Sequence, residues 1–291
     1  MAMKAARFES AGIRLPIALG FVMPVFVLSL AIPHLTRTNG TLLGALLSSL
    51  VACGLGVAAY VAYVRRIERR PVTELALPGA GKEIGSDFVL GAALFAIAIG
   101  TLALLGDYNV HGRHDLAIVA IPLVAAIGTA FIEEIVFRGI VFRIVEGALG
   151  TWIALILSSA IFGLLHLVNP HATLQGAVAI VFEAGVMLAA AYLLTRRLWL
   201  PIGIHAGWNF TQGGIFGVSV SGQPSGGLLD GTLSGPEWLS GGVFGVEASI
   251  VAVILGIALG TTLLVMAWRR GRFIAPYWRR VRPATMAAVD A

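Results

Sequence analysis

Charge is scarce in this chain of 291 residues. Asp, Glu, Lys and Arg together make up only 12% of it, whereas hydrophobic residues make up 58% and the mean hydropathy is +0.90. A soluble globular domain of this length does not need so much apolar surface. The composition therefore excludes a soluble protein and predicts one that lies in a membrane.

Cysteine is almost absent. The single one, Cys53, lies in an apolar run, which excludes an internal disulfide framework and a multi-cysteine metal site. The formal net charge of +5 does not indicate a nucleic-acid partner, because the basic residues stand next to apolar runs. We therefore expect membrane lipids as partners and no nucleic acid. A clear signal-cleavage site is also lacking, so the first apolar run is predicted to be a retained helix.

Long apolar runs dominate the rest of the chain. A membrane-spanning helix needs about 20 largely apolar residues. The chain supplies about eight such runs, near residues 15–35, 42–64, 87–106, 115–143, 151–168, 173–195, 199–217 and 248–268. The predicted fold is all-α: a polytopic membrane helix bundle that forms a single domain over residues 1–291.

Basic residues are distributed unevenly between the ends of these runs. If both termini are cytoplasmic, 18 of the 20 Lys and Arg fall in cytoplasmic segments, and only Arg37 and Arg113 fall outside. The positive-inside rule therefore predicts an N-in, C-in protein, which we expect in a bacterial cytoplasmic membrane. Residues 65–86 are expected to form a cytoplasmic surface loop. The Gly- and Ser-rich residues 218–247 are expected to form a solvated external linker, with a mobile lid as the alternative.

Ionisable residues are rare inside the predicted helices, so each one is a candidate functional residue. Glu133 and Glu134 are adjacent in the fourth apolar run, and Arg138 follows them. Glu134 and Arg138 are four residues apart and can pair on one helix face, whereas Glu133 is rotated by about 100° and can face a polar cavity. The alternative is one buried charge cluster that only holds helices together. Glu183, in the sixth run, is expected to pair with Arg138 or a histidine.

Two histidines occupy later apolar runs. His166 lies in the fifth, where a lone histidine commonly makes an interhelical hydrogen bond. His205 and Asn209 lie four residues apart in the seventh and therefore share a helix face. Counted from the predicted helix ends, Glu133 and His166 differ in depth by about 10 Å, which helix tilt or a shift of the ends would absorb.

Three motifs, EExxxR at 133–138, FxxxH at 162–166 and HxxxN at 205–209, follow one another in apolar runs. In this order they resemble the CPBP family of intramembrane glutamic endopeptidases, also called the Abi family, which is related to the CAAX prenyl proteases. The resemblance covers residues 115–212, the expected catalytic core. It implies an endopeptidase that hydrolyses a membrane-associated, in some relatives lipidated, substrate without a cofactor or a covalent enzyme intermediate.

The resemblance also implies a role for each motif residue. The catalytic residues would be Glu133, His166, His205 and Asn209, and the structural supports would be Glu134 and Arg138. Glu133 would be the general base that deprotonates the attacking water, and His166 would help to hold that water. His205 and Asn209 would stabilise the oxyanion of the tetrahedral intermediate.

Other functions stay open on the residues alone. Glu133, His166 and His205 match the ligand number of a catalytic zinc site, although the chain has no HExxH motif. The same polar residues fit a non-enzymatic membrane scaffold or an immunity protein. They also fit the proton relay of a small transporter, but the chain has no evident internal repeat.

Overall fold

A computed structural model describes the backbone of residues 2–280 and the side chains of residues 11–280. Among the predicted cytoplasmic basic residues, Arg282 and the side chains of Lys4 and Arg7 lie outside the described part. The α-helices and strands, in chain order, are α1 (Ala2–Leu35), α2 (Leu42–Leu50), α3 (Gly56–Tyr63), α4 (Ala80–Leu105), β1 (Tyr108–Arg113), α5 (Ala120–Glu134), α6 (Arg143–Leu149), α7 (Thr151–Leu165), α8 (Leu174–Ile180), α9 (Val186–Thr195), α10 (Trp199–Phe210), β2 (Leu229–Leu233), α11 (Glu237–Ser240) and α12 (Ile250–Arg269).

Several of these helices are joined end to end by wider π-helical turns. The π-helical segments are Val51–Leu55, Val64–Glu68, Ile135–Phe142, Val181–Gly185 and Thr211–Ile215. They make continuous rods of α2 with α3, of α5 with α6, and of α8 with α9. π-Helical turns occur often at functional sites: Ile135–Phe142 directly follows Glu134 and carries Arg138, and Val181–Gly185 carries Glu183.

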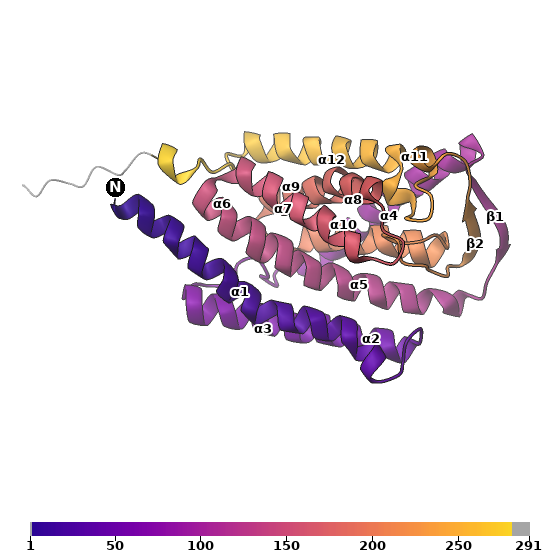
Figure 1. Ribbon diagram of the computed structural model, residues 1–291, viewed down its shortest axis with the longest axis horizontal. Coiled ribbons are helices and arrows are strands. Elements are labelled where there is room, and N and C mark those ends of the chain that lie inside the picture. The colour runs from indigo at the N-terminus through magenta and orange to yellow at the C-terminus, as the bar shows by residue number, and fades with distance from the viewer. Residues whose placement is uncertain (1, 281–291) are drawn as a thin grey trace, which may run out of the picture.

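The predicted all-α membrane bundle is confirmed. In the described part of the chain, seven helical spans are long and apolar enough to cross a membrane: 11–35, 42–68, 80–105, 116–149, 151–168, 174–195 and 250–269. The remaining predicted segment, 199–217, is α10 with its π-helical continuation to Ile215, and it lies inside the bundle with most of its residues buried. With α10 counted as a further pass, the chain crosses the bundle an even number of times. The start of α1 and the C-terminal end of α12 therefore lie at the same end of the bundle (Figure 1).

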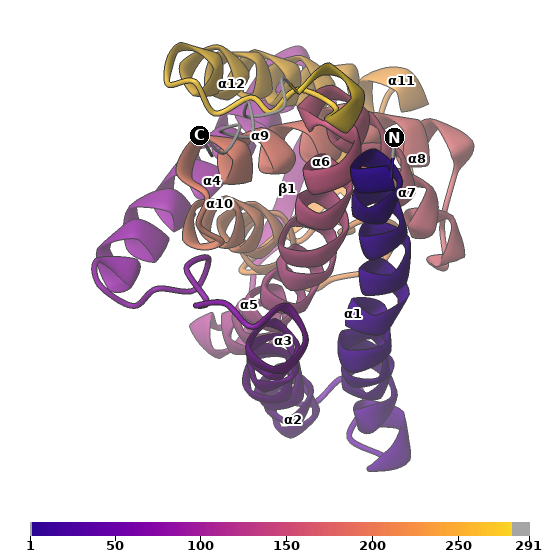
Figure 2. The same ribbon diagram turned by 90° about the vertical axis from the view of Figure 1, so that its left-hand side faces the viewer.

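The bundle is built around α10. Seen from the end that holds the termini, α10 lies between α4 and α5, while α1 to α3 form one edge and α12 the opposite edge (Figure 2). Glycines permit the tight contact with α4, since a Cβ on Gly207 would lie 2.0 Å from the carbonyl oxygen of Phe88. Gly203 faces the same helix one turn earlier, so the pair forms a GxxxG motif of closely packed membrane helices.

The loop expected over residues 65–86 is shorter than predicted. Helical structure continues to Glu68, where Arg69 takes a left-handed conformation and ends it, and α4 begins at Ala80. A basic run with prolines and glycines suggested a loop over the whole stretch, but both ends of it are helical and extend past the apolar runs. Ion pairs, including one between Arg70 and Glu74, fold the intervening chain against the bundle.

Two strands interrupt the helical fold at the opposite end of the bundle. β1 and β2 pair antiparallel, from Tyr108 opposite Leu233 to Arg113 opposite Leu229, with an irregularity between Val110 and Gly112. This sheet ties the connection between α4 and α5 to the segment that precedes α12 (Figure 1).

Residues 218–247 form a folded cap over this end. Phe244 within them is fully buried, so the prediction of a solvated linker is wrong. The glycines that suggested flexibility support tight turns, since Gly222 and Gly245 take positive φ angles that other residues rarely adopt. The cap is therefore a packed part of the bundle.

Candidate active site

A buried ion pair stands at the centre of the site. The carboxylate of Glu134 accepts a hydrogen bond from Arg138 at 2.8 Å, as their spacing of four residues predicts, and both side chains are almost completely buried. Arg138 also donates to the carbonyl oxygens of Ala184 and Gly185, which belong to the π-helical turn between α8 and α9. Its guanidinium carbon lies 4.5 Å from the centre of the Phe162 ring. The ion pair thus joins three passes of the bundle.

His205 lies between the two adjacent glutamates. Its Nδ1 is 3.0 Å from Oε1 of Glu134, and its Nε2 is 3.9 Å from Oε2 of Glu133. A carboxylate oxygen accepts, so Nδ1 carries a hydrogen and Nε2 is directed to the side of Glu133. The position of His205 follows from the glycines of α10: Gly203 and Gly207 face α4, so the residue between them faces away from α4, toward α5.

Glu134 therefore does more than the sequence indicates. The spacing of the EExxxR motif predicts its bond to Arg138 but contains no information on a residue 71 positions further along the chain. In the structure the same oxygen, Oε1, accepts from both Arg138 and His205. This shared acceptor fixes the orientation of the histidine ring.

Glu133 is the member of the pair that remains free. Its side chain is 14% exposed, and among the described residues its Oε2 has no hydrogen-bond partner. It lies near the middle of the span 116–149, which extends six residues beyond the predicted end. The longer helix moves Glu133 toward mid-membrane and so reduces the expected mismatch in depth with His166.

His166 begins a short 3-10 turn at the end of α7. Its Nδ1 lies 2.8 Å from the carbonyl oxygen of Phe162, and because a carbonyl can only accept, Nδ1 carries the hydrogen and Nε2 keeps a lone pair in the neutral ring. The ring of Phe162 also contacts His205, with 6.3 Å between ring centres. Phe162, the apolar member of the FxxxH motif, therefore packs against both histidines.

All four predicted catalytic residues line one cavity. It has a volume of about 600 Å³, and Glu133, His166, His205 and Asn209 lie on its wall together with residues of the cap at 220–226. The size is within the range of pockets that bind a small ligand or a short peptide segment. Four residues from three separate passes thus face the same space.

A second, smaller cavity contains two acidic residues with no assigned role. Glu183 and Glu247 line a space of about 20 Å³, enough for one water, next to both histidines. Glu247 accepts hydrogen bonds from the backbone N–H and the hydroxyl of Ser221. Burial raises the pKa of Glu247 to about 7, although Ser221 acts in the opposite direction.

The expected ion pair of Glu183 is not formed. Arg138 bonds to the backbone carbonyls that follow Glu183, and among the described residues Oε2 of Glu183 has no hydrogen-bond partner. The acidic neighbour, Glu247, escaped the sequence analysis because it lies in the segment that was interpreted as a linker. No spacing rule connects residues 183 and 247, so only the folded cap brings them together.

Metal ligation was the main chemical alternative for this site. Within residues 11–280, no group of three or more His, Cys, Asp and Glu side chains is placed so that it could hold one metal ion. His205 directs Nδ1 to Glu134, which already bonds to Arg138. Of the three proposed ligands, His205 is thus held by Glu134 and His166 by the backbone of Phe162.

Comparison with known proteins places the same residues in context. Residues 115–211 match the family described as "Type II CAAX prenyl endopeptidase Rce1-like". A curated protein of Bacillus subtilis (strain 168), named "Putative membrane peptidase YdiL", is 29% identical over 180 residues, which cover 57% of this chain and 69% of the relative. No solved structure matches the chain. The matched region begins at the span that carries both glutamates and ends just after the HxxxN motif.

Proposed function

We propose that this chain, whose residues 115–211 match the family described as "Type II CAAX prenyl endopeptidase Rce1-like", is a membrane peptidase that cleaves a peptide bond with a water that Glu133 deprotonates. One observation carries the proposal: the Glu133 side chain, 14% exposed, stands on the wall of the 600 Å³ cavity beside a histidine that Glu134 orients. The zinc, scaffold and transporter alternatives have no comparable observation in their favour.

The reaction needs a base and a route for one proton. Glu133 takes a proton from the water, whose oxygen forms a bond to the carbonyl carbon of the peptide, and the carbonyl oxygen becomes negatively charged. When this intermediate collapses, the C–N bond breaks and Glu133 returns the proton to the leaving nitrogen. A neutral His166 ring offers the lone pair of Nε2 as an acceptor that would hold the water beside this carboxylate.

The negative charge that develops on the carbonyl oxygen needs hydrogen-bond donors. Asn209 offers its side-chain amide from the wall of the cavity, one turn beyond His205. Because Nδ1 of His205 donates to Glu134, its Nε2 donates only when the ring carries both protons. Each such donor lowers the barrier by about 3 kcal/mol in comparable sites.

Glu134 and Arg138 are positioning residues in this mechanism. They bond to each other, and they hold His205 and the turn between α8 and α9 in place without lining the large cavity. The substrate is a membrane-associated polypeptide, with or without a lipid modification, because the cavity is inside the bundle and its lining is mostly apolar.

Glu133→Gln tests the proposal, because the amide keeps the shape of the side chain and cannot accept the proton. Cells that carry this variant should accumulate membrane-associated precursors that cells with the unaltered chain process, as measured by quantitative proteomics of membranes. Glu237→Gln, which alters an exposed glutamate of the cap, is the matched control and should process normally. If membranes of the two variants show the same precursors and the Glu133→Gln protein is folded, a scaffold or immunity role replaces the peptidase.

A further inference from the structure

We propose that the catalytic cavity opens on the extracytoplasmic side of the membrane, so that the substrate is a polypeptide segment exposed on that side. The proposal rests on the proposed peptidase function and adds the side from which the substrate enters. Four features of the structure carry it: the position of the cavity, a second arm of that cavity, the closed opposite end and the distribution of charge.

The cavity extends from Glu133 toward one end of the bundle only. Its walls are the first half of the α5 span, from Ile118 to Thr129, Gly40 in the loop between α1 and α2, and residues 220–226 of the cap. The start of α5, the loop between α1 and α2 and the cap all lie toward the end of the bundle where β1 and β2 stand (Figure 1), and Glu133 comes near the other end of α5. A molecule that reaches Glu133 through this cavity therefore comes from the β1–β2 end.

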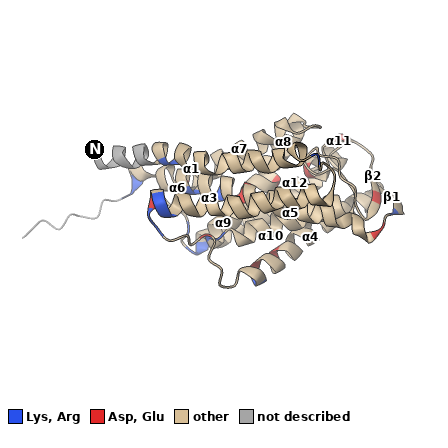
Figure 3. Ribbon diagram, turned by 90° about the horizontal axis from the view of Figure 1, so that it is seen from below, with Lys and Arg blue, Asp and Glu red and all other residues tan. Residues whose placement is uncertain are grey.

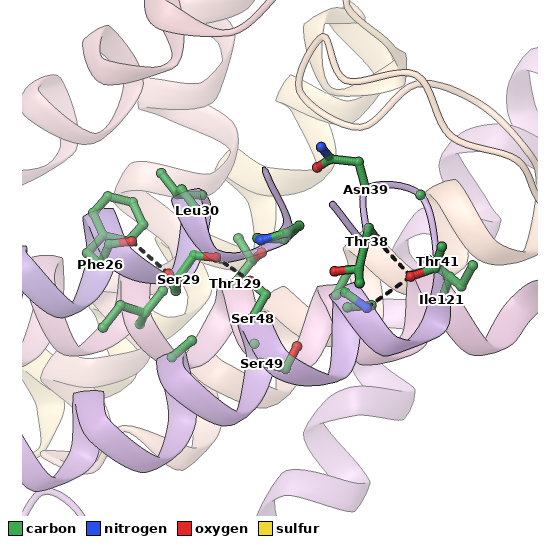
Figure 4. Close-up of a pocket in the computed structure, with 18 of the residues that line it drawn as sticks. Phe26, Ser29, Leu30, Thr38, Asn39, Thr41, Ser48, Ser49, Ile121 and Thr129 are labelled. Carbon is green, nitrogen blue, oxygen red and sulfur yellow. Dashed lines mark hydrogen bonds between the residues drawn. The ribbon is translucent and has the colours of Figure 1, made fainter. Parts of the chain in front are cut away.

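A second arm reaches Glu133 from the same end. A groove of about 250 Å³ between α1, α2 and α5 shares Glu133 and Thr129 with the large cavity, and hydroxyl-bearing residues line much of it (Figure 4). The hydroxyls of Ser48 and Ser49 donate to the backbone carbonyls of Ser29 and Val124, which holds the three helices apart in a fixed geometry. Two arms that meet at the proposed base suit a chain that continues on both sides of the scissile bond.

The opposite end of the bundle is closed. Directly beyond Glu134, all eight residues of the π-helical segment Ile135–Phe142 are buried. Further along, the carboxylate of Glu68 bonds to Arg14 at 3.0 Å and to Arg143 at 2.9 Å, and its side chain is almost fully buried. Glu146 and Arg196 form another ion pair at this end. These contacts join separate passes, so buried side chains and ion pairs fill the space between Glu133 and this end.

The charge distribution assigns a side to each end. The described Lys and Arg residues gather toward the closed end, near α6 and the termini (Figure 3). Arg37 and Arg113 belong to the open end, in the loop after α1 and at the end of β1. By the positive-inside rule the closed end is cytoplasmic, and the open end is extracytoplasmic.

The lining also restricts the chemistry of the substrate. Among the described residues, Glu133 is the only charged side chain on the wall of the large cavity, and apolar residues such as Ile121 and Pro122 face the same space. An acidic segment would be repelled by Glu133, and a highly charged one would lose its hydration without compensation. The segment that fits is largely uncharged.

Thiol accessibility tests the side of entry without a known substrate. Single cysteines replace Thr129 or Ala125, which line both arms, in a Cys53→Ser background that removes the native thiol. A membrane-impermeant cationic methanethiosulfonate reagent is added to right-side-out cells and to inverted vesicles. Ile127→Cys, on the same helix but outside both arms and 36% exposed, is the matched control for a lipid-facing position.

We expect the Thr129→Cys and Ala125→Cys proteins to react at least about 10-fold faster than the Ile127→Cys protein in cells, because a charged reagent needs a water-filled path to a thiolate. Neither should react in inverted vesicles. Reaction from the cytoplasmic side only, or equal rates at positions 127 and 129, would overturn the proposal.

The cleaved substrates give a second, independent result. New N-termini that are present with the unaltered chain and lost with Glu133→Gln should map to extracytoplasmic segments of membrane proteins. Cleavage sites in cytoplasmic tails would overturn the proposed side of entry and leave the peptidase function intact. If membranes with the unaltered chain and membranes with Glu133→Gln contain the same N-termini, the peptidase function is overturned. The thiol reactions would still decide the side on which the cavity opens.

Discussion

At the scale of single residues, the two adjacent glutamates have different partners and therefore different tasks. Glu134 is completely buried and bonded to Arg138 and His205, whereas Glu133 is 14% exposed and lines the large cavity. One position of separation on a helix is a rotation of about 100°, so neighbours in sequence face different surroundings. We expect the loss of Glu134 to affect mainly folding and the loss of Glu133 to affect mainly the reaction.

Arg138→Ala should destabilise the protein strongly. Breaking a buried ion pair leaves Glu134 uncompensated in low dielectric and costs about 3–5 kcal/mol. The melting temperature and the yield of detergent-solubilised Arg138→Ala protein should therefore fall well below those of the Glu133→Gln protein. Small and equal effects of both substitutions would show that the ion pair does not contribute to stability.

Glu247 should make stability depend on pH. Burial raises its pKa to about 7, so the folded protein keeps this proton at pH values where the unfolded chain has released it. Unfolding therefore becomes easier as pH rises from about 5 to above 7, by about 3 kcal/mol in total. In Glu247→Gln this dependence should disappear from chemical unfolding curves measured across pH 5–8, and in the exposed Glu237→Gln it should persist. An unchanged slope in Glu247→Gln would contradict the buried, protonated state.

At the scale of helices, glycines decide which face of α10 meets which neighbour. Gly91 of α4 and Gly207 of α10 lie where a Cβ would come within about 2 Å of a backbone oxygen of the other helix. This contact turns the face that carries His205 toward α5 and the glutamates. The GxxxG pair thus positions a proposed catalytic residue that it does not touch.

Gly207→Ala should therefore reduce both stability and activity. The added methyl group must push α10 away from α4, at a cost of about 1–3 kcal/mol. A displacement of 1 Å at His205 could lower the rate by about 100-fold. Gly100→Ala is the control in α4, since nothing lies within 4 Å of its added Cβ and alanine favours the helix. Melting temperature and precursor processing, measured for both variants, should fall only for Gly207→Ala; an unaffected Gly207→Ala protein would contradict this packing.

At the scale of the whole molecule, the basic residues and the opening of the cavity lie at opposite ends of the bundle. The basic residues gather at the end with both termini, and the proposed active site opens at the end with β1 and β2 (Figures 1 and 3). Seven spans and the shorter, buried α10 bring the chain back to the end where it began. An even number of passes is therefore required for an N-in, C-in protein.

Reporter fusions should show this topology. Fusions after Arg70, Arg197 and Ala291 should report the cytoplasm, and a fusion near Gly226 should report the opposite side, because this topology keeps 17 of the 20 basic residues in cytoplasmic segments once the membrane-buried Arg138 is set apart. Alkaline phosphatase and green fluorescent protein fusions, measured in parallel, give opposite signals at each position. An extracytoplasmic signal from the C-terminal fusion would contradict an even number of passes.

The sequence by itself determined the membrane fold, the approximate spans and the set of polar residues that had to be satisfied within the bundle. Apolar runs of about 20 residues have few alternatives to a spanning helix, so their positions agree with the structure to within a few residues at most ends. The motif spacing likewise determined the bond between Glu134 and Arg138, since residues four apart meet on any helix.

Tertiary structure alone decided how those helices meet. The bond from His205 to Glu134, the cavity shared by three passes, and the approach of Glu247 to Glu183 all join residues that are far apart in the chain. Periodicity describes which face of a helix is polar but not which helix lies opposite. The cap at 218–247 was mistaken for a linker for a related reason: glycine marks both mobile chain and tight turns, and only packing around residues such as Phe244 distinguishes the two.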